Sequence, residues 1–327
     1  MYIIAEMACS HEGEPSYAKE IIHGAIEADA DAIQFQIWKL DEMVVPHHDN
    51  YEVLSSIEMT YAQWEELAQD ARAAGSIDII ACVYERESIN FAEGINVDAY
   101  KVHSSDVSNP YLLERVARTG KRVDLSVGGS TLDEIQDAVD TIRRTSNSEI
   151  WLMYGYQDFP TRPDDVHLDY MVKLKELFEL PTGYQDHSAG GTPEGFWLPA
   201  AAIGAGVDIL EKHITHDRSY EGIDHEAALN PDEFAEFVRM THQVEAARGI
   251  SVPRNFSEEE EAYRSNSKKS IVAAQNLPKG TRITRSNVTF RRANELGLFP
   301  NEFSKIEGKT LRQGVSRFQR IKDTDVS

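Results

Sequence analysis

The chain has 327 residues, of which 41% are hydrophobic and 27% charged, a balance typical of a folded globular protein. Its formal net charge is −22 and no cluster of Lys and Arg is apparent, which argues against nucleic acid as a partner. With no apolar run near the roughly 20 residues that span a bilayer, no signal-peptide pattern and only two isolated cysteines, we expect a cytoplasmic protein without membrane contact.

Eight short apolar segments recur between residue 2 and about residue 212, each followed by an amphipathic segment. This alternation predicts a parallel sheet wrapped by helices. Eight repeats with right-handed crossovers favour a closed (βα)8 barrel, a TIM barrel of the α/β class, over an open sheet. The predicted strands are YIIAEM, DAIQFQ, IDIIAC, DAYKV, RVDLS, EIWLMY, LPTGYQ and VDILEK.

Three of the helices between the strands have clear sequence signals. Residues 15–28 carry apolar side chains at intervals of three and four, with Pro15 suited to the first turn. A second helix is predicted from Thr60, which forms a capping box with Gln63, as far as Gly75. A third is expected to begin near Ser130.

The chain divides into three parts by composition. Residues 1–250 form the predicted barrel. Residues 251–266 are polar and strongly charged, which is typical of a linker. Residues 267–327 contain strand-like runs broken by a Pro-Lys-Gly turn, which predicts a small, mostly β second domain.

Polar residues at the ends of apolar strands are candidates for the active site, because a (βα)8 barrel places its site at the carboxyl ends of the strands. His187 and His213 end the seventh and eighth strands, so their imidazoles can converge on one divalent ion with open positions for substrate oxygen. Two hydrogen-bonded core histidines would produce the same spacing. Asp186 and Asp224 lie nearby, as orienting or as capping groups.

Three further strand ends carry groups that suit catalysis or anion binding. Glu6 follows four apolar residues and is a candidate general base. Lys101 ends the fourth strand, where it either pairs with a carboxylate or phosphate or extends to solvent. The Gly-rich turn after Ser126 offers backbone N–H groups just before a helix, although such turns are common.

Together these residues resemble the sialic acid synthase family, whose members condense phosphoenolpyruvate with an N-acetylated amino sugar to form nonulosonic acids. The resemblance extends almost end to end. It rests on IAEMACSHEG, DAIQFQIWK, DAYKVHSSDVSNPYLLERVARTGKRVDLSVGGSTLDEI, FPTRPDDVHL, GYQDHSAG, EKHITHDRSYEGIDHEAALNPDEF and the closing domain.

The resemblance implies a role for each matching residue. It places a divalent metal, Mn²⁺ first with Mg²⁺ or Co²⁺ as alternatives, on His187 and His213, and it gives catalytic roles to Glu6 and Asp224. It also implies a homodimer in which an antifreeze-like (SAF) domain, residues 267–327, covers the partner's barrel mouth. The implied donor contacts are Lys101, Ser104, Ser126, Gln34, Gln36, Gln157 and Gln185, and the implied acceptor contacts are Arg292, Asp106 and Phe159.

The chain departs from the family pattern at the positions that face the donor's phosphate. Gln34 stands where the family has a lysine, Cys82 where it has a threonine, and Gln185 where it has a serine. An asparagine and a tyrosine of the family become Gln157 and Phe159. Because a charge-assisted hydrogen bond contributes roughly 1.5–3 kcal/mol, loss of the lysine alone is expected to weaken phosphate binding about tenfold or more.

Three functions are therefore kept open. The first is a metal-assisted synthase that condenses phosphoenolpyruvate with a sugar aldehyde. The second is a metal-dependent aldolase with an unphosphorylated keto-acid donor, and the third is a non-catalytic carbohydrate-binding protein. Acceptor specificity is expected to lie in loops such as 44–58, which we interpret as an ordinary exposed connection.

Overall fold

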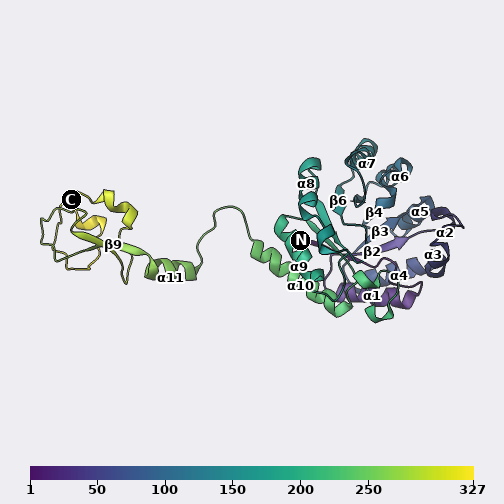
Figure 1. Ribbon diagram of the computed structural model, residues 1–327, viewed down its shortest axis with the longest axis horizontal. Coiled ribbons are helices and arrows are strands. Elements are labelled where there is room, and N and C mark those ends of the chain that lie inside the picture. The colour runs from purple at the N-terminus through teal and green to yellow at the C-terminus, as the bar shows by residue number, and fades with distance from the viewer. The chain divides into compact units, whose positions relative to one another are not determined.

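The computed structural model describes residues 1–327 and divides them into two compact units, Met1–Gly249 and Ile250–Ser327 (Figure 1). The segment predicted as a linker, 251–266, contains most of a helix, α11 (Glu258–Ser267). Ser257 caps this helix, and four glutamates occupy its first turn, where the helix dipole stabilises negative charge. The same run of charge that suggested a linker therefore favours a helix.

Met1–Gly249 forms the closed eight-stranded parallel barrel that the sequence predicts, with β1 pairing to β8 to close it. Every predicted apolar segment forms a strand. The strands are β1 (Tyr2–Glu6), β2 (Ala32–Ile37), β3 (Asp78–Val83), β4 (Ala99–Val102), β5 (Arg122–Ser126), β6 (Ile150–Tyr154), β7 (Thr182–Asp186) and β8 (Ile209–His213).

Helices surround the barrel, and their ends follow the local capping signals. The capping box of Thr60 and Gln63 is present, and an equivalent box of Thr131 and Glu134 begins the helix expected near Ser130. The helices are α1 (Pro15–Glu27), α2 (Leu40–Met43), α3 (Tyr51–Ile57), α4 (Tyr61–Ala74), α5 (Arg86–Gly94), α6 (Pro110–Arg118), α7 (Leu132–Thr145), α8 (Leu168–Phe178), α9 (Glu194–Ala205) and α10 (Pro231–Arg248). None of them combines the length and apolar character that a membrane span requires.

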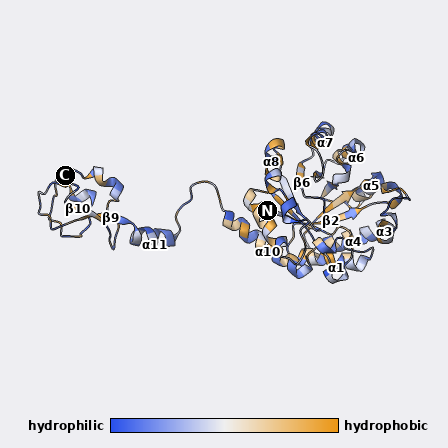
Figure 2. Cartoon of the chain, viewed as in Figure 1, coloured by the Kyte–Doolittle hydropathy of each residue, from blue (hydrophilic) through white to orange (hydrophobic).

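The barrel interior is apolar toward the amino ends of the strands and polar toward their carboxyl ends. Figure 2 shows apolar strands at the centre and helices with mixed faces around them. Inside the barrel, one apolar layer of side chains is formed by Ile4, Ala32, Ile80, Ala99, Met153 and Ile209. Because side chains alternate along a strand, Glu6 shares the inner face with Ile4 and lies closer to the carboxyl end. The part of the interior at the carboxyl ends of the strands is thus lined by polar side chains.

The second unit is small and mostly extended, as predicted. Strands β9 (Lys269–Ala273) and β10 (Val288–Arg292) pair antiparallel, and isolated bridges join the remaining segments. They enclose a core of their own, formed by Ile271, Ala273, Leu277, Ile283, Val288, Ile306, Leu311, Val315, Ile321 and Val326.

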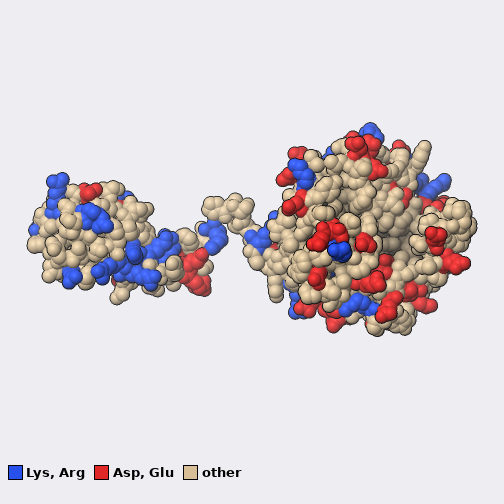
Figure 3. All heavy atoms as spheres, viewed as in Figure 1, with Lys and Arg blue, Asp and Glu red and all other residues tan.

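The two units differ strongly in charge. Residues 1–249 contain 18 Lys and Arg against 46 Asp and Glu, a formal charge of −28, whereas residues 250–327 contain 15 against 9, a charge of +6. Figure 3 shows acidic side chains prominent on the barrel and basic ones on the smaller unit. The net charge of the whole chain therefore conceals a small unit with an excess of basic residues.

Candidate active site

A cavity of about 170 Å³ lies inside the barrel at the carboxyl ends of the strands. Most of the predicted site residues converge on it, together with His103 and Glu211, which the sequence analysis did not select. His103 lies two residues after Lys101 and Glu211 two residues before His213, so strand alternation alone could have identified both. The lining residues are Glu6, Gln36, Lys101, His103, Ser126, Gln157, Phe159, Gln185, His187, Glu211, His213 and Asp224.

Four predicted residues do not line this cavity. Gln34 is completely buried inside the barrel, and neither atom of its amide group has a hydrogen-bond partner. Ser104 begins a short 3-10 helix (Ser104–Asp106), and Asp106 lines a neighbouring pocket. Arg292 is exposed at the end of β10 in the other unit.

Lys101 is the only Lys or Arg that lines the cavity, and two carboxylates already share it. Its Nζ lies 2.5 Å from Glu211 Oε1 and 3.4 Å from Glu6 Oε2, and all three side chains are buried. Burial opposes the charged form of Lys101, but the carboxylates of Glu211 and Glu6 hold its pKa above the ordinary value. Burial raises the pKa of Glu6 to about 7, against the opposing effect of Lys101.

Neutral groups extend this charged centre through hydrogen bonds. The Ser126 hydroxyl donates to Gln185 Oε1 at 2.6 Å, and Gln185 Nε2 donates to Glu211 Oε1 at 2.9 Å. On the other side, Gln36 Nε2 donates to Glu6 Oε1 at 3.4 Å. One lysine, two carboxylates, two amides and one hydroxyl therefore form a connected network in this half of the cavity.

The two histidines face the same cavity from neighbouring strand ends, with ring centroids 5.4 Å apart. His187 Nδ1 lies 2.7 Å from the carbonyl oxygen of Tyr156, which can only accept, so Nδ1 carries the hydrogen and the other ring nitrogen keeps its lone pair. His213 Nδ1 is buried without a partner. Burial lowers the pKa of both imidazoles, and the neighbouring His187 lowers that of His213 further.

These features fit ligation of a divalent ion. Ligation requires a neutral imidazole, and a hydrogen bond at the second ring nitrogen commonly orients it. His187 has both properties, whereas His213 has no such orienting bond. Metal–nitrogen bonds of about 2.1 Å would allow two rings at this separation to share an ion. No group of three or more His, Cys, Asp and Glu side chains in the structure is arranged for a metal, so the pair would leave the other coordination positions to water or substrate.

Two close backbone approaches help to form this wall. A Cβ at Gly155 would lie 2.7 Å from the Gln185 carbonyl oxygen and 3.1 Å from His187 Cε1, and one at Gly128 would lie 2.1 Å from the Gly155 carbonyl oxygen. Glycine at these two positions allows the segment after β5 to come this near the segment after β6, and the segment after β6 to come this near β7 and His187. The ring of Phe159 then lies over the histidines, with its centroid 4.4 Å from that of His187.

Asp186 and Lys212, two of the polar strand-end residues, face away from the cavity. They form a fully buried ion pair at 2.8 Å, and Asp186 also accepts from the Ser188 hydroxyl. Asp186 therefore has no contact that would orient a metal ligand, whereas Asp224 lines the cavity and accepts from the backbone N–H of Cys9 at 3.3 Å. Strand alternation explains this separation, because each outward residue adjoins an inward histidine.

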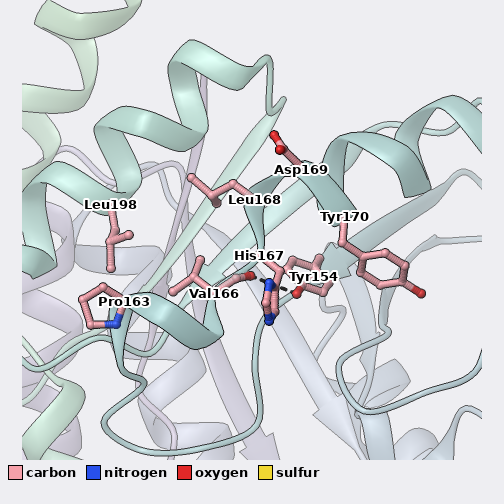
Figure 4. A pocket seen from close by; sticks show the side chains of 8 residues that line it. All are labelled: Tyr154, Pro163, Val166, His167, Leu168, Asp169, Tyr170 and Leu198. Carbon is pink, nitrogen blue, oxygen red and sulfur yellow. Dashed lines mark hydrogen bonds between the residues drawn. The ribbon is translucent and has the colours of Figure 1, made fainter.

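A larger hollow of about 630 Å³ lies on the outside of the barrel around the start of α8 (Figure 4). Tyr154 from β6 points into it and donates its hydroxyl hydrogen to the Val166 carbonyl oxygen at 2.9 Å. Leu198 of α9 lies opposite. This hollow lies apart from the charged centre, so the inner cavity remains the candidate active site.

Comparison with known proteins places the chain among known families. The model of the NeuB family matches residues 21–252, and that of the SAF domain matches residues 268–325. An uncharacterized protein of Methanocaldococcus jannaschii is 33% identical over 89% of this chain and 84% of its own. The N,N'-diacetyllegionaminic acid synthase of Legionella pneumophila is 29% identical over 96% of this chain and 91% of its own.

A human enzyme and a solved bacterial structure show the same relationship. The human N-acetylneuraminate-9-phosphate synthase is 29% identical over 95% of this chain and 88% of its own. The crystal structure of N-acetylneuraminic acid synthetase from Leptospira borgpetersenii, in complex with citrate, is 30% identical with a TM-score of 0.74, and the match covers 80% of this chain and 90% of that one. The barrel and the second domain thus each match a known family, and the sequence resembles these relatives over nearly the whole chain.

Proposed function

Because this chain belongs to the NeuB family, whose relatives are synthases of sialic and related acids, we propose that it condenses phosphoenolpyruvate with an aldose to form a nonulosonic or related 3-deoxy-2-keto sugar acid. One observation carries the proposal. Glu6, Lys101, His187 and His213, from four different strands or strand ends, all line one cavity at the barrel mouth.

The reaction balances without an oxidant or reductant. C3 of phosphoenolpyruvate forms the new bond to the aldehyde carbon, water adds at C2, and phosphate leaves. Lys101 would hold an anionic group of the donor, with hydrogen bonds from Ser126 and Gln185 beside it. Glu6 would accept the proton from the water that attacks C2.

His187 and His213 are the residues that would hold a divalent ion, Mn²⁺ first and Mg²⁺ or Co²⁺ as alternatives. When bound, such an ion supplies Lewis acidity to an aldehyde oxygen. The chain's own contribution is to keep the imidazoles neutral by burial and to fix His187 through the Tyr156 carbonyl group. Phe159 lies over both rings and would limit the access of water.

The acceptor would be contacted by Asp224 and Phe159 from the barrel, by Asp106 at its edge, and by Arg292 of a partner chain. We propose a homodimer in which the SAF domain covers the partner's barrel mouth. The opposite charges of the two units, −28 and +6, support this arrangement because they would steer the basic domain of one copy toward the acidic barrel of another.

Direct detection of the product tests the proposed function. The full chain, incubated with Mn²⁺, phosphoenolpyruvate and a panel of N-acylated aldoses, is expected to yield a keto acid that mass spectrometry identifies as the sum of a three-carbon unit and the aldose. A panel that gives no such product with any aldose would contradict the proposal.

A second candidate, an aldolase that uses pyruvate, is favoured by one specific observation. Lys101, the only Lys or Arg that lines the cavity, already pairs with two carboxylates, which leaves no free cation there for a donor's phosphate. Thermal unfolding separates the two candidates. Phosphoenolpyruvate is expected to raise the melting temperature more than pyruvate does, and the reverse order would favour the aldolase.

Glu6→Gln is expected to lower kcat about a hundredfold and to remove the pH dependence below neutrality. Only the carboxylate form of Glu6 can accept a proton, and burial raises the pKa of this group to about 7. The wild-type kcat/KM should therefore increase with pH up to about 7 and then level off. Steady-state rates between pH 5.5 and 8.5 measure both effects.

Glu85→Gln is a suitable control for this prediction. Glu85 is also buried, but its carboxylate caps helix α5 and does not line the cavity. This variant should keep the wild-type pH profile. An unchanged profile in Glu6→Gln would exclude Glu6 as the base.

A further inference from the structure

The buried ion pair of Asp186 and Lys212 lies immediately beside the two histidines in sequence. Asp186 ends β7 and precedes His187, and Lys212 precedes His213, the last residue of β8. Asp186 and Lys212 are also the last register partners of these two strands. Both side chains are 0% exposed, with Lys212 Nζ 2.8 Å from Asp186 Oδ2. The pair thus joins the strands at the point where the candidate metal ligands begin.

Ser188 extends this connection to the other side of His187. Lys212 Nζ donates to the Ser188 carbonyl oxygen at 2.8 Å. Asp186 accepts from the Ser188 backbone N–H at 3.2 Å and from its hydroxyl at 2.8 Å, and the Tyr184 hydroxyl donates to Asp186 Oδ1 at 3.0 Å. The ammonium group of Lys212 therefore bonds both residues that flank His187 in the chain, although none of these bonds reaches an imidazole.

Beyond this pair, the backbones of the two histidines bond to different parts of the barrel. The His187 carbonyl oxygen accepts from the backbone N–H of Thr161, in the segment after β6. The His213 carbonyl oxygen accepts from the backbone N–H of Leu229, just before α10. His213 Nδ1 has no partner. The position of the His213 ring therefore depends on a backbone that the neighbouring Lys212 helps to fix.

The surroundings of the ion pair are apolar. The outward residues that precede it on the two strands, Tyr184 and Leu210, are register partners and belong to the main hydrophobic core. Two charges lose hydration free energy in such surroundings, and a well-packed neutral pair of similar volume is often at least as stable. Stability alone therefore does not explain why an ion pair occupies this position.

On the basis of the proposed function, we infer that Asp186 and Lys212 are positioning residues that fix the separation of the His187 and His213 imidazoles for one divalent ion. Charge-assisted hydrogen bonds suit this role because they are short and directional. The effect passes through the backbone, since each side chain lies on the face of its strand opposite to the next residue. An ion about 2.1 Å from each ring nitrogen tolerates only a narrow range around the observed centroid separation of 5.4 Å.

Metal titration of a double variant tests the inference. Asp186→Asn combined with Lys212→Met removes both charges, so the net charge beside the histidines is unchanged and only the connection between the strands is lost. The asparagine keeps an acceptor for Ser188 and Tyr184. Calorimetric titration of the metal-free full chain with Mn²⁺ is expected to show an affinity about tenfold to a hundredfold lower than in the wild type, the range for residues that orient metal ligands.

The matched control is an ion pair at the opposite end of the same two strands. Asp208, which directly precedes β8, accepts from the backbone N–H of Thr182, the first residue of β7, at 2.9 Å. It also pairs with Lys175 of α8 at 2.6 Å. Asp208→Asn combined with Lys175→Met removes this connection at the amino ends of the strands. This double variant should bind Mn²⁺ with wild-type affinity.

Weaker Mn²⁺ binding in the Asp186 and Lys212 double variant alone would support the positioning role, provided that circular dichroism shows both double variants to be folded. Wild-type affinity in that variant, or an equal loss in both double variants, would overturn the inference. A wild-type chain that binds no Mn²⁺ would overturn it as well, because no ion would then require the two imidazoles to be positioned.

These binding results are independent of turnover. A chain that shows the expected difference in Mn²⁺ affinity but makes no keto acid would refute the proposed function and leave the positioning role intact. A chain that makes the keto acid, but binds Mn²⁺ equally well with and without the ion pair, would refute the positioning role alone.

Discussion

Lys101→Met is expected to destabilise the barrel by about 3–5 kcal/mol at pH 8, because it leaves two buried carboxylates without their shared cation. Glu6 and Glu211 lie on either side of Lys101 Nζ, and both side chains are only 2% exposed. Methionine keeps the apolar length of the side chain and removes only the charge. Urea unfolding at fixed pH measures the change in the free energy of unfolding.

The loss of unfolding free energy caused by Lys101→Met should decrease as the pH falls. Burial already raises the pKa of Glu6 above its ordinary value of 4.5 to about 7, and removal of Lys101 raises it further. An acid whose pKa is higher in the folded protein than in the unfolded chain destabilises the fold above its unfolded pKa. The penalty should therefore be largest above pH 7 and should shrink toward pH 5.

Lys173→Met is the matched control for Lys101→Met. Lys173 pairs with Glu176 on the exposed face of α8, where an ion pair contributes little. Its replacement should change the free energy of unfolding by less than about 0.5 kcal/mol at either pH. A Lys101 variant as stable as this control would show that the three buried charges do not depend on one another.

Replacing His187 or His213 with alanine is expected to lower kcat at least about a thousandfold and to abolish stoichiometric metal binding. The magnitude follows from a Lewis acid that contributes several kcal/mol at the transition state. Each variant would leave a single imidazole, which is too few protein ligands for firm binding. Metal content after dialysis against Mn²⁺ provides a readout that does not depend on activity.

His103→Asn separates ligands from residues that only line the cavity. His103 also lines it, but its Nδ1 lies 3.0 Å from the Ser105 hydroxyl and it is not one of the predicted ligands. This variant should retain metal. Equal metal content in His187→Ala and in the wild type would remove the case for a metal site at the histidine pair.

The fold could be predicted because its local signals agree with one another. Most strands begin with a short run of apolar residues, and the capping box at Thr60 lies where the periodic pattern begins. Helix α11 was missed because a run of glutamates is compatible with both a linker and a helix N-terminus. The charge difference between the units was hidden in a whole-chain sum.

Much of the candidate site could also be predicted, because the carboxyl ends of all eight strands meet at one mouth of the barrel. Lys101 and His187 were found in this way. Glu211 and His103 were missed because only the last residues of each strand were considered, although alternation places both on the inner face. The same alternation separates Asp186 from His187 and sends it to a buried ion pair outside the cavity.

Other properties of the site depend on packing that no local pattern encodes. The sequence shows that Gln34 is neutral, but not that its amide is buried without partners or that it lies outside the cavity wall. Similarly, the loop 44–58 has no motif, and its position depends on the packing of Leu54 against a small cluster that contains Cys9 and Trp38, which lie earlier in the chain.

Donor choice is the most direct test of the central claim that this cavity condenses phosphoenolpyruvate with an aldose. The full chain is given Mn²⁺, phosphoenolpyruvate, pyruvate and an N-acetylated hexosamine together, and phosphorus and proton NMR follow the three organic reactants and the released phosphate. We expect one inorganic phosphate to be released for each aldose consumed while pyruvate stays constant. Consumption of pyruvate and aldose with phosphoenolpyruvate intact would contradict the account.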